Sequence, residues 1–246
     1  MKRVGFLICG TQKGGTTALA DYLRGHPELF IPEKKELHFF DDETQDWTRP
    51  DYRGYHLNYQ HSDRESLWGE ASPIYMYWED SCRRIWRYNR AMKLIVTLRN
   101  PISRAYSHWT MERRRGAEGL SFEDAIRQEA VRCRSALPNQ HRVFSYLDRG
   151  FYSEQLRRLW RYFPKEAVLV LRQEDLYEDP GCVLNRVCEH LNVSAMIGVK
   201  RLVSHASQYE EPMHQSTKEL LIELYWHEIC CLEALLGWDC QNWLKA

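Results

Sequence analysis

The sequence has no excess of charge of either sign. Its 246 residues contain 34 Lys and Arg and 34 Asp and Glu, so it lacks the broad positive field that attracts nucleic acid. No stretch approaches the roughly 18 apolar residues of a membrane-spanning helix. We therefore expect no nucleic-acid partner and no membrane association, and any preference for an anion must arise from a local group of residues.

Signals for export, for zinc binding and for a second domain are also missing. The basic start at Lys2 and Arg3 is followed by the apolar run 4–9, which is too short for a signal peptide. The eight cysteines show no zinc-site spacing, so reduced, buried thiols are the default interpretation. We find no internal repeat, low-complexity stretch or linker. The sequence thus predicts one domain over residues 1–246, located in the cytoplasm.

The most informative feature that is present is the stretch 10–17, Gly-Thr-Gln-Lys-Gly-Gly-Thr-Thr, which directly follows the apolar run 4–9. Glycines let backbone N–H groups approach an anion, a lysine supplies charge, and hydroxyls add donors. The positive end of the helix that follows would point to the same place. This order predicts a strand, a phosphate-binding loop and a helix, although a structural turn rich in glycine would have the same composition.

The loop differs from the one that binds ATP or GTP. In that loop, Gly-x-x-x-x-Gly-Lys-Ser/Thr, the lysine directly follows the second glycine and the adjacent hydroxyl holds Mg²⁺. In this chain Thr16 occupies the place of the lysine, and the lysine lies earlier, at Lys13, inside the turn. The displacement favours a nucleotide with a shorter phosphate arm over a nucleoside triphosphate.

A second motif begins where the apolar run 94–98 ends. A nucleoside-triphosphatase strand would normally end here in an acid for magnesium, but this one ends in Arg99. Pro101 suits the first position of a helix, and Ser107 lies further along that helix. A guanidinium at the carboxyl end of a strand, with a hydroxyl nearby, suits a phosphate held without metal. An exposed helical serine is the other interpretation of Ser107.

Together these motifs resemble those of the sulfotransferases that use 3′-phosphoadenosine 5′-phosphosulfate (PAPS). The family's loop Lys-x-Gly-Thr-Thr is matched by Lys13, Gly14, Gly15, Thr16 and Thr17. Its Arg-x-Pro-x-x-Arg-x-x-Ser pattern, which binds the 3′-phosphate, is matched from Arg99 to Ser107. The resemblance implies PAPS as the cofactor, no metal, and an α/β fold of the P-loop-containing nucleotide-binding type. Lys13 would hold the 5′-phosphosulfate and stabilise the charge that develops as the S–O bond breaks.

The segment 36–40, Glu-Leu-His-Phe-Phe, resembles the Glu-x-x-Phe-Phe element of the heparan-sulfate type of sulfotransferase. That glutamate is the proposed general base in those relatives, so the resemblance makes Glu36 the first choice for taking the acceptor's proton. His38 is the rival base, because an imidazole titrates near neutrality and many small-molecule sulfotransferases use histidine. On a strand, Glu36 and His38 would share a face. A structural histidine that bonds to the backbone is the alternative for His38.

Two places depart from the family pattern. Ala71 stands where the heparan-sulfate type carries a lysine, so the task of that lysine falls either to another residue or more heavily to Lys13. Relatives also place a loop that closes over the nucleotide within 198–214, commonly with a Lys-Gly-Arg sequence. Lys200 and Arg201 occur there without the glycine, and they are either nucleotide contacts or part of an exposed basic turn.

Apolar runs alternate with helical patterns along the chain, which implies a parallel sheet covered by helices on both faces. Strands are predicted at 4–9, 29–31, 94–98 and 167–171. Helices are predicted at about 16–25, 80–91, 101–115, 121–133, 152–163, 179–191 and 215–236. Both phosphate motifs follow strands, and open α/β sheets bind ligands at the carboxyl ends of their strands.

The residues and the resemblance together predict a cytoplasmic, bacterial sulfotransferase that uses PAPS and acts by direct in-line transfer. The acceptor would be a hydroxyl or an amine of a small metabolite, a natural product or a carbohydrate, with some of the aromatic residues between 47 and 78 as its walls. Two alternatives remain at this point. One is a P-loop kinase that uses ATP, and the other is a non-catalytic module that senses the nucleotide.

Overall fold

The computed structural model describes residues 2–62, 66–199 and 212–245. The chain divides into two compact units, and each is taken by itself. The first comprises Met1–Leu98 and Arg158–Ser204, and the second comprises Arg99–Arg157 and His205–Ala246. Lys200 and Arg201 lie outside the described residues, so their roles stay predictions, as does the expectation of one domain over residues 1–246.

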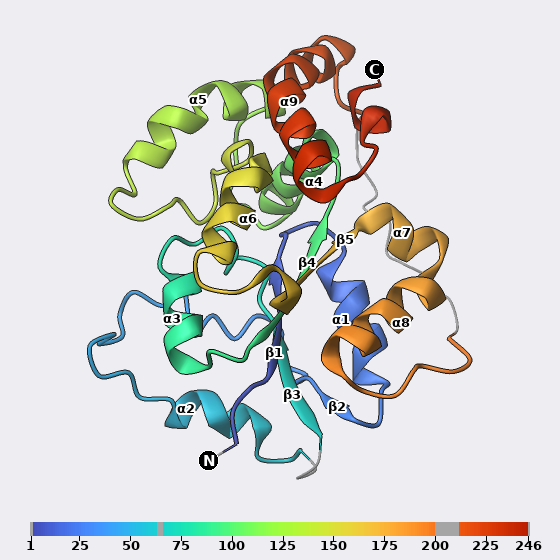
Figure 1. The fold of residues 1–246 in the computed structure, drawn as a ribbon. Coiled ribbons are helices and arrows are strands. Elements are labelled where there is room, and N and C mark those ends of the chain that lie inside the picture. Colours follow the sequence, from blue (N-terminus) through green and yellow to red (C-terminus); the bar gives the residue numbers. More distant parts are fainter. Residues whose placement is uncertain (1, 63–65, 200–211, 246) are drawn as a thin grey trace. The chain divides into compact units, whose positions relative to one another are not determined.

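The first unit is built on a parallel sheet, whose five strands within the described residues have the order β2-β3-β1-β4-β5 (Figure 1). The strands are β1 (Phe6–Gly10), β2 (Leu29–Phe30), β3 (Leu67–Ala71), β4 (Lys93–Leu98) and β5 (Val168–Arg172). Each neighbouring pair runs parallel. The predicted α/β fold with a central parallel sheet is therefore confirmed.

Helices cover both faces of this sheet. On one face, Phe6 and Ile8 of β1 pack in a buried core with side chains of α1 (Thr16–Arg24) and α8 (Pro180–Leu191). Figure 1 shows α3 (Ser81–Tyr88) on the opposite face. The middle strands β1 and β4 are thus buried from both sides, which is why their sequences are continuous apolar runs without alternation.

Strand β3 is an element that the sequence pattern does not predict. Its sequence lacks an apolar run, because Gly69 and Glu70 interrupt it. Gly69 is paired in register with Phe6 of β1, and a Cβ at position 69 would lie 2.0 Å from the Phe6 ring. The glycine therefore makes room for the phenylalanine. The pattern also does not predict the short helices α2 (Arg53–His56) and α7 (Gln173–Glu178).

The second unit is helical. Its helices are α4 (Pro101–Arg114), α5 (Phe122–Arg134) and α9 (Gln215–Leu236), and the chain returns to the first unit along α6 (Tyr152–Trp160). Helix α4 begins as predicted, with Pro101 in its first turn. The Asn100 side chain caps this end by accepting a hydrogen bond of 2.9 Å from the Ile102 backbone.

The remaining regular structure consists of single turns of 3₁₀-helix at Leu57–Tyr59, Asp148–Gly150, Lys165–Ala167 and Gln241–Leu244. Among the residues that the structure describes, no helix combines the length and the apolar character that crossing a membrane requires.

The close contact at Gly69 leads to a prediction about stability. We expect Gly69→Ala to lower the free energy of unfolding by about 1–3 kcal/mol, because the new methyl group must displace the Phe6 ring from a close-packed core. Gly54→Ala is the matched control, since nothing lies within 4 Å of the position that its methyl group would take and alanine favours the helix there. Urea unfolding of both variants measures the difference, and equal stabilities would contradict the packing argument.

Candidate active site

The predicted phosphate loop connects β1 to α1 as a tight turn. The Thr11 N–H donates to the Thr97 carbonyl at 3.0 Å, and the Gly14 N–H donates to the Thr11 carbonyl at 2.8 Å. A Cβ on Gly14 would lie 2.5 Å from the Thr97 carbonyl oxygen, so only glycine fits this position. Lys13 and Gly15 adopt left-handed backbone conformations, with φ of 69° and 89°. The loop therefore turns its backbone sharply at the carboxyl end of β1.

Helix α1 begins at this loop in a way that suits an anion. No side chain of the described residues caps its N-terminus, and its first turn contains no acidic residue. Thr16 is buried in the first turn, whereas Thr17 is exposed. The unpaired N–H groups and the positive end of the helix dipole attract negative charge. Together with Lys13, this end of α1 fits a phosphate or phosphosulfate group.

Two residues at this loop were not predicted from the sequence. Thr97, near the end of β4, donates from its hydroxyl to the Gly10 carbonyl at 3.3 Å. Gln173, at the start of α7, lies against Gly15, with its Cγ 3.3 Å from the position of a Cβ there. Both residues lie at the carboxyl ends of strands that neighbour one another, so the rule that predicts the loop could also have predicted them.

The second phosphate motif lies in the other unit. The Arg99 guanidinium donates from Nε to the Ser103 hydroxyl at 2.9 Å, and the Tyr152 hydroxyl donates to the Arg99 carbonyl at 2.9 Å. Ser107 is only 1% exposed, so the interpretation as an exposed helical serine is wrong. Its hydroxyl meets no hydrogen-bond partner within residues 2–62, 66–199 and 212–245. Because buried polar groups are normally paired, this hydroxyl fits a ligand oxygen such as that of a phosphate.

The segment that contains Glu36 and His38 is not a strand, so that expectation is wrong. Both residues are left-handed, with φ of 51° and 54°, and such a backbone cannot belong to a pleated strand. The Glu36 N–H donates to the carbonyl of Ala71, the last residue of β3, at 3.2 Å. Glu36 therefore lies at the carboxyl edge of the sheet, one strand away from β1.

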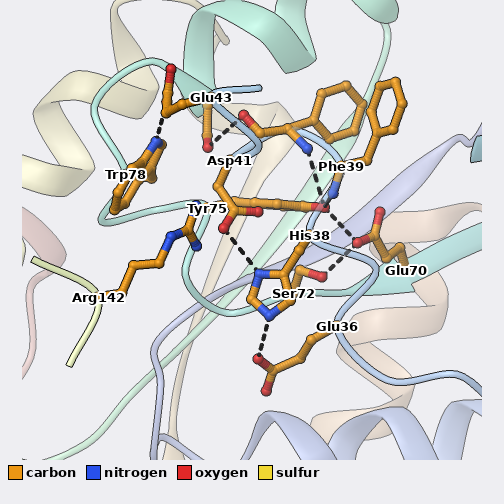
Figure 2. Close-up of polar contacts among 12 residues, drawn as sticks. Glu36, His38, Phe39, Asp41, Glu43, Glu70, Ser72, Tyr75, Trp78 and Arg142 are labelled. Carbon is orange, nitrogen blue, oxygen red and sulfur yellow. Dashed lines mark hydrogen bonds and ion pairs between the residues drawn. The ribbon is translucent and has the colours of Figure 1, made fainter. Parts of the chain in front are cut away.

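The two candidate bases nevertheless meet. His38 Nε2 lies 3.3 Å from Glu36 Oε2, and His38 Nδ1 lies 2.9 Å from Asp41 Oδ2 (Figure 2). The Asp41 side chain is fully buried, whereas those of His38 and Glu36 are 44% and 37% exposed. Among the residues that the structure describes, His38 thus bonds to carboxylates and not to the backbone. Asp41 was missed in the sequence, where an acid three residues after a histidine was the available signal.

The two carboxylates change the chemistry of His38. Its hydrogen bond to Asp41, and next its hydrogen bond to Glu36, raise the pKa of His38 from 6.5 to about 9 against the opposing effect of burial. At neutral pH the ring is therefore an imidazolium with no lone pair to accept a proton. This geometry favours Glu36 over His38 as the group that takes a proton from an acceptor.

The aromatic residues between 47 and 78 mostly form core. The buried ones are Tyr55, Tyr59, Tyr75, Tyr77 and Trp78. Trp47, Tyr52 and Trp68 are partly exposed. Of these, Trp68 stacks on Tyr59 with ring centroids 4.9 Å apart. A contribution to an acceptor wall stays a prediction for the three partly exposed rings.

Comparison with known proteins identifies the family of this chain. Residues 5–223 match the family model described as "Sulfotransferase domain". The chain belongs to this sulfotransferase family. The resemblance carried by the loop, by the Arg99 motif and by the Glu36 segment is thereby confirmed at the level of the family.

The curated relatives include carbohydrate sulfotransferases. Mouse heparan sulfate glucosamine 3-O-sulfotransferase 6 is 32% identical over 206 residues, which cover 82% of this chain and 56% of the relative. The membrane-associated sulfotransferase kil1 of Dictyostelium discoideum is 22% identical, over 89% of this chain and 62% of its own length. The chain spans about half the length of the curated relatives it matches.

Solved structures agree with the fold. The crystal structure of a sulfotransferase from Alicyclobacillus acidocaldarius matches with a TM-score of 0.87 and 28% identity, and the match covers 100% of both chains. A sulfotransferase domain from the curacin biosynthetic pathway matches with a TM-score of 0.56 and 18% identity, over 79% of this chain and 76% of that domain. The second likeness concerns the fold alone. The P-loop-containing fold class predicted from the sequence is confirmed.

The contact between His38 and Asp41 leads to a prediction about titration. We expect the His38 ring to keep its proton up to about pH 9, and Asp41→Asn to lower the pKa of His38, because the variant removes the main cause of the shift. NMR titration of the histidine ring protons measures both. Asp42→Asn is the matched control, since Asp42 Oδ1 accepts instead from the Thr44 N–H at 2.9 Å. A wild-type His38 that titrates near 6.5 would contradict the geometry.

The same shift sets the direction of a stability change. Because the folded pKa lies above the ordinary value of 6.5, the pairing stabilises the fold fully below pH 6.5 and the contribution is lost as the pH rises through about 9. We therefore expect the difference in stability between the wild type and Asp41→Asn to shrink over this range, as measured by urea unfolding at a series of pH values.

Proposed function

We propose that this chain transfers a sulfuryl group from PAPS to a hydroxyl or an amine of a small metabolite, a natural product or a carbohydrate. One observation carries the proposal. The anion-binding loop after β1 and the Glu36 carboxylate beside the last residue of β3 lie at the carboxyl ends of adjacent parallel strands. A loop for the donor's phosphate end and a base for the acceptor are thus provided at one edge of the sheet.

The binding roles follow from the two phosphate motifs. Lys13, the Gly15 N–H and the first turn of α1 would hold the 5′-phosphosulfate, while Gly14 shapes the loop through its own bond to the Thr11 carbonyl. Arg99 and the buried Ser107 hydroxyl would hold the 3′-phosphate, through a charged fork and one hydroxyl donor. Bound PAPS supplies an activated sulfuryl group, whose S–O bond to the 5′-phosphate breaks as the acceptor atom bonds to sulfur.

The proton and the electron pair have separate destinations. Glu36 takes the proton from the acceptor hydroxyl or amine as the new bond to sulfur forms. The electron pair of the breaking S–O bond stays on the bridging oxygen of the departing phosphate, and the Lys13 ammonium stabilises the charge there. The products are the sulfated acceptor and adenosine 3′,5′-bisphosphate. The protonated Glu36 then returns its proton to water, which its partly exposed side chain can reach.

His38 and Asp41 would act as supports for the base. The His38 imidazolium contacts Glu36 through Oε2, so it holds the carboxylate in place and leaves Oε1 for the acceptor. Buried Asp41 keeps the imidazole ring oriented and protonated. The triad thus supports Glu36 as the base and His38 as a charged supporting residue.

The acceptor class is proposed from similarity and from one departure. Relatives named for 3-O-sulfation of heparan sulfate glucosamine support a carbohydrate hydroxyl among the possible acceptors. Ala71 ends β3 with a methyl group where the heparan-sulfate type carries a lysine, so Lys13 would stabilise the departing phosphate without help from that position. A bacterial source is supported by the full-length match to the Alicyclobacillus structure, and a cytoplasmic location stays a prediction.

Nucleotide binding tests the donor. We expect calorimetric titration to show tight binding of adenosine 3′,5′-bisphosphate and much weaker binding of ATP with magnesium. Ser107→Ala should lower the affinity for the bisphosphate by about 5- to 20-fold, because one charge-assisted hydrogen bond is lost. It should not lower the free energy of unfolding, because the hydroxyl has no protein partner among the described residues. Thr110→Ala on the same helix is the control, since its hydroxyl bonds to the Tyr106 carbonyl at 2.9 Å. Preference for ATP with magnesium would favour a kinase.

Turnover tests the base. We expect Glu36→Gln to lower the rate of sulfuryl transfer from PAPS by about 10²- to 10⁴-fold, the usual contribution of a general base, while the affinity for adenosine 3′,5′-bisphosphate stays unchanged. The rate is measured as acceptor-dependent release of the bisphosphate, with a panel of sugars, phenols and amines. Equal turnover in the variant would remove Glu36 as the base, and an absence of transfer in the wild type with every acceptor would favour a nucleotide sensor.

A further inference from the structure

Glu70 of β3 is a buried carboxylate that the proposed proton transfer does not use. It is 1% exposed, and three hydroxyls donate to its two oxygens. Ser72 and Tyr75 donate to Oε1 at 2.5 and 2.6 Å, and Tyr55 donates to Oε2 at 2.6 Å. Burial raises the pKa of Glu70, and the three hydroxyls oppose that rise. A carboxylate held this way fixes the direction of each hydroxyl proton.

The Tyr75 hydroxyl has a second set of contacts, with the backbone beside His38. It accepts the N–H of Phe39 at 2.9 Å and that of Phe40 at 3.4 Å (Figure 2). A hydroxyl carries one proton and two lone pairs. Because its proton is committed to Glu70, both lone pairs are available for these two N–H groups. Tyr75 is therefore a bridge from β3 to the segment 38–41.

Phe39 and Phe40 are the two residues that separate His38 from Asp41. Their peptide groups form the turn across which Asp41 reaches the His38 ring. His38 itself is left-handed, a conformation that a residue other than glycine keeps only where its surroundings fix it. The position of the turn thus determines whether the His38 ring meets its carboxylate partner.

The turn is also held from its other side. The Phe40 carbonyl accepts hydrogen bonds from Arg84 Nη1 at 3.0 Å and from the Ser81 hydroxyl at 3.1 Å. Helix α3 therefore binds the Phe40 carbonyl, and Tyr75 binds the N–H groups of Phe39 and Phe40. The N–H groups that Tyr75 binds are closer to His38 along the chain than the carbonyl that α3 binds.

We propose that Tyr75, oriented by Glu70, is a positioning residue that holds the 38–41 turn so that Asp41 meets the His38 ring and, through it, Glu36. The proposal rests on the proposed role of Glu36 as the base. Tyr75 is fully buried, and its hydroxyl acts through the Phe39 and Phe40 backbone. Its removal should therefore change the state of His38 and the rate of transfer, but not the binding of nucleotide.

Two variants that differ only in which hydroxyl is lost test this role. Tyr75→Phe removes the bridge, so we expect the pKa of His38 to fall from about 9 toward 6.5. We also expect kcat to fall by about tenfold, the effect of one lost hydrogen bond, with unchanged affinity for adenosine 3′,5′-bisphosphate. Tyr55→Phe is the matched control, because its hydroxyl also donates to Glu70 but no backbone N–H of residues 38–41 bonds to it in the described structure. It should leave the His38 titration and kcat unchanged.

Three results would overturn the proposal. One is an unchanged His38 titration in Tyr75→Phe, and another is an equal effect of both tyrosine variants, which would mean that the cluster only stabilises the fold. The third concerns the double variant Tyr75→Phe with Asp41→Asn. If Tyr75 acts through Asp41 and His38, the kcat of the double variant should equal that of Asp41→Asn alone. A kcat lowered by the product of the two single losses would show that Tyr75 does not act through Asp41.

Measurements on the unmodified protein cover the case in which Tyr75→Phe does not fold. We expect the Phe39 amide, and to a lesser extent the Phe40 amide, to be protected from hydrogen exchange in the wild type, as their bonds to Tyr75 require. Rapid exchange of the Phe39 amide would overturn the proposal. Hydrogen exchange and the His38 titration do not require turnover. Failure to detect sulfuryl transfer would therefore contradict the proposed function, whereas these two measurements alone would decide whether Tyr75 positions the 38–41 turn.

Discussion

The parallel pairing of β1 with β3 and with β4 is the constraint on which the site depends. Parallel strands end at the same edge of a sheet, so the segments that follow them are delivered to one place. The phosphate loop follows β1 and is closed by a bond to Thr97 of β4, and the Glu36 backbone bonds to the end of β3. Gly69 leaves room for the Phe6 ring against β3, so the packing of β1 beside β3 depends on a residue without a side chain.

Backbone strain is concentrated at this edge. Of the residues other than glycine with positive φ in the described structure, Lys13, Glu36 and His38 belong to the candidate site, and Asn192 ends helix α8. Such conformations cost free energy and persist only where packing and hydrogen bonds fix them. The buried Asp41, the Tyr75 hydroxyl and the Arg84 guanidinium supply those bonds around residues 36–41. The rigid surroundings thus hold a charged triad in which Asp41 is buried and the side chains of Glu36 and His38 remain open to solvent.

The sequence predicted most of the fold and the types of residue at the site, but not how the site is supported. Continuous apolar runs revealed β1 and β4 because strands buried on both faces need them. Strand β3 was not predicted, because its glycine is explained only by Phe6, which is far away in the sequence, and its buried glutamate only by tyrosine hydroxyls whose direction the sequence does not give. The contact between Glu36 and His38 was predicted from the alternation of side chains on a strand. In the structure, left-handed backbone conformations at both residues bring the two side chains together instead.

The hydroxyl of Ser107 has a consequence for how the protein behaves without its nucleotide. A buried donor without a partner in the described chain is a small defect in the folded state, and a ligand oxygen would repair it. Ligand binding to the native state also shifts the folding equilibrium by mass action. Folding and nucleotide recognition would then be thermodynamically linked in the second unit, so the amount of intact protein in a cell would rise and fall with the supply of the sulfate donor.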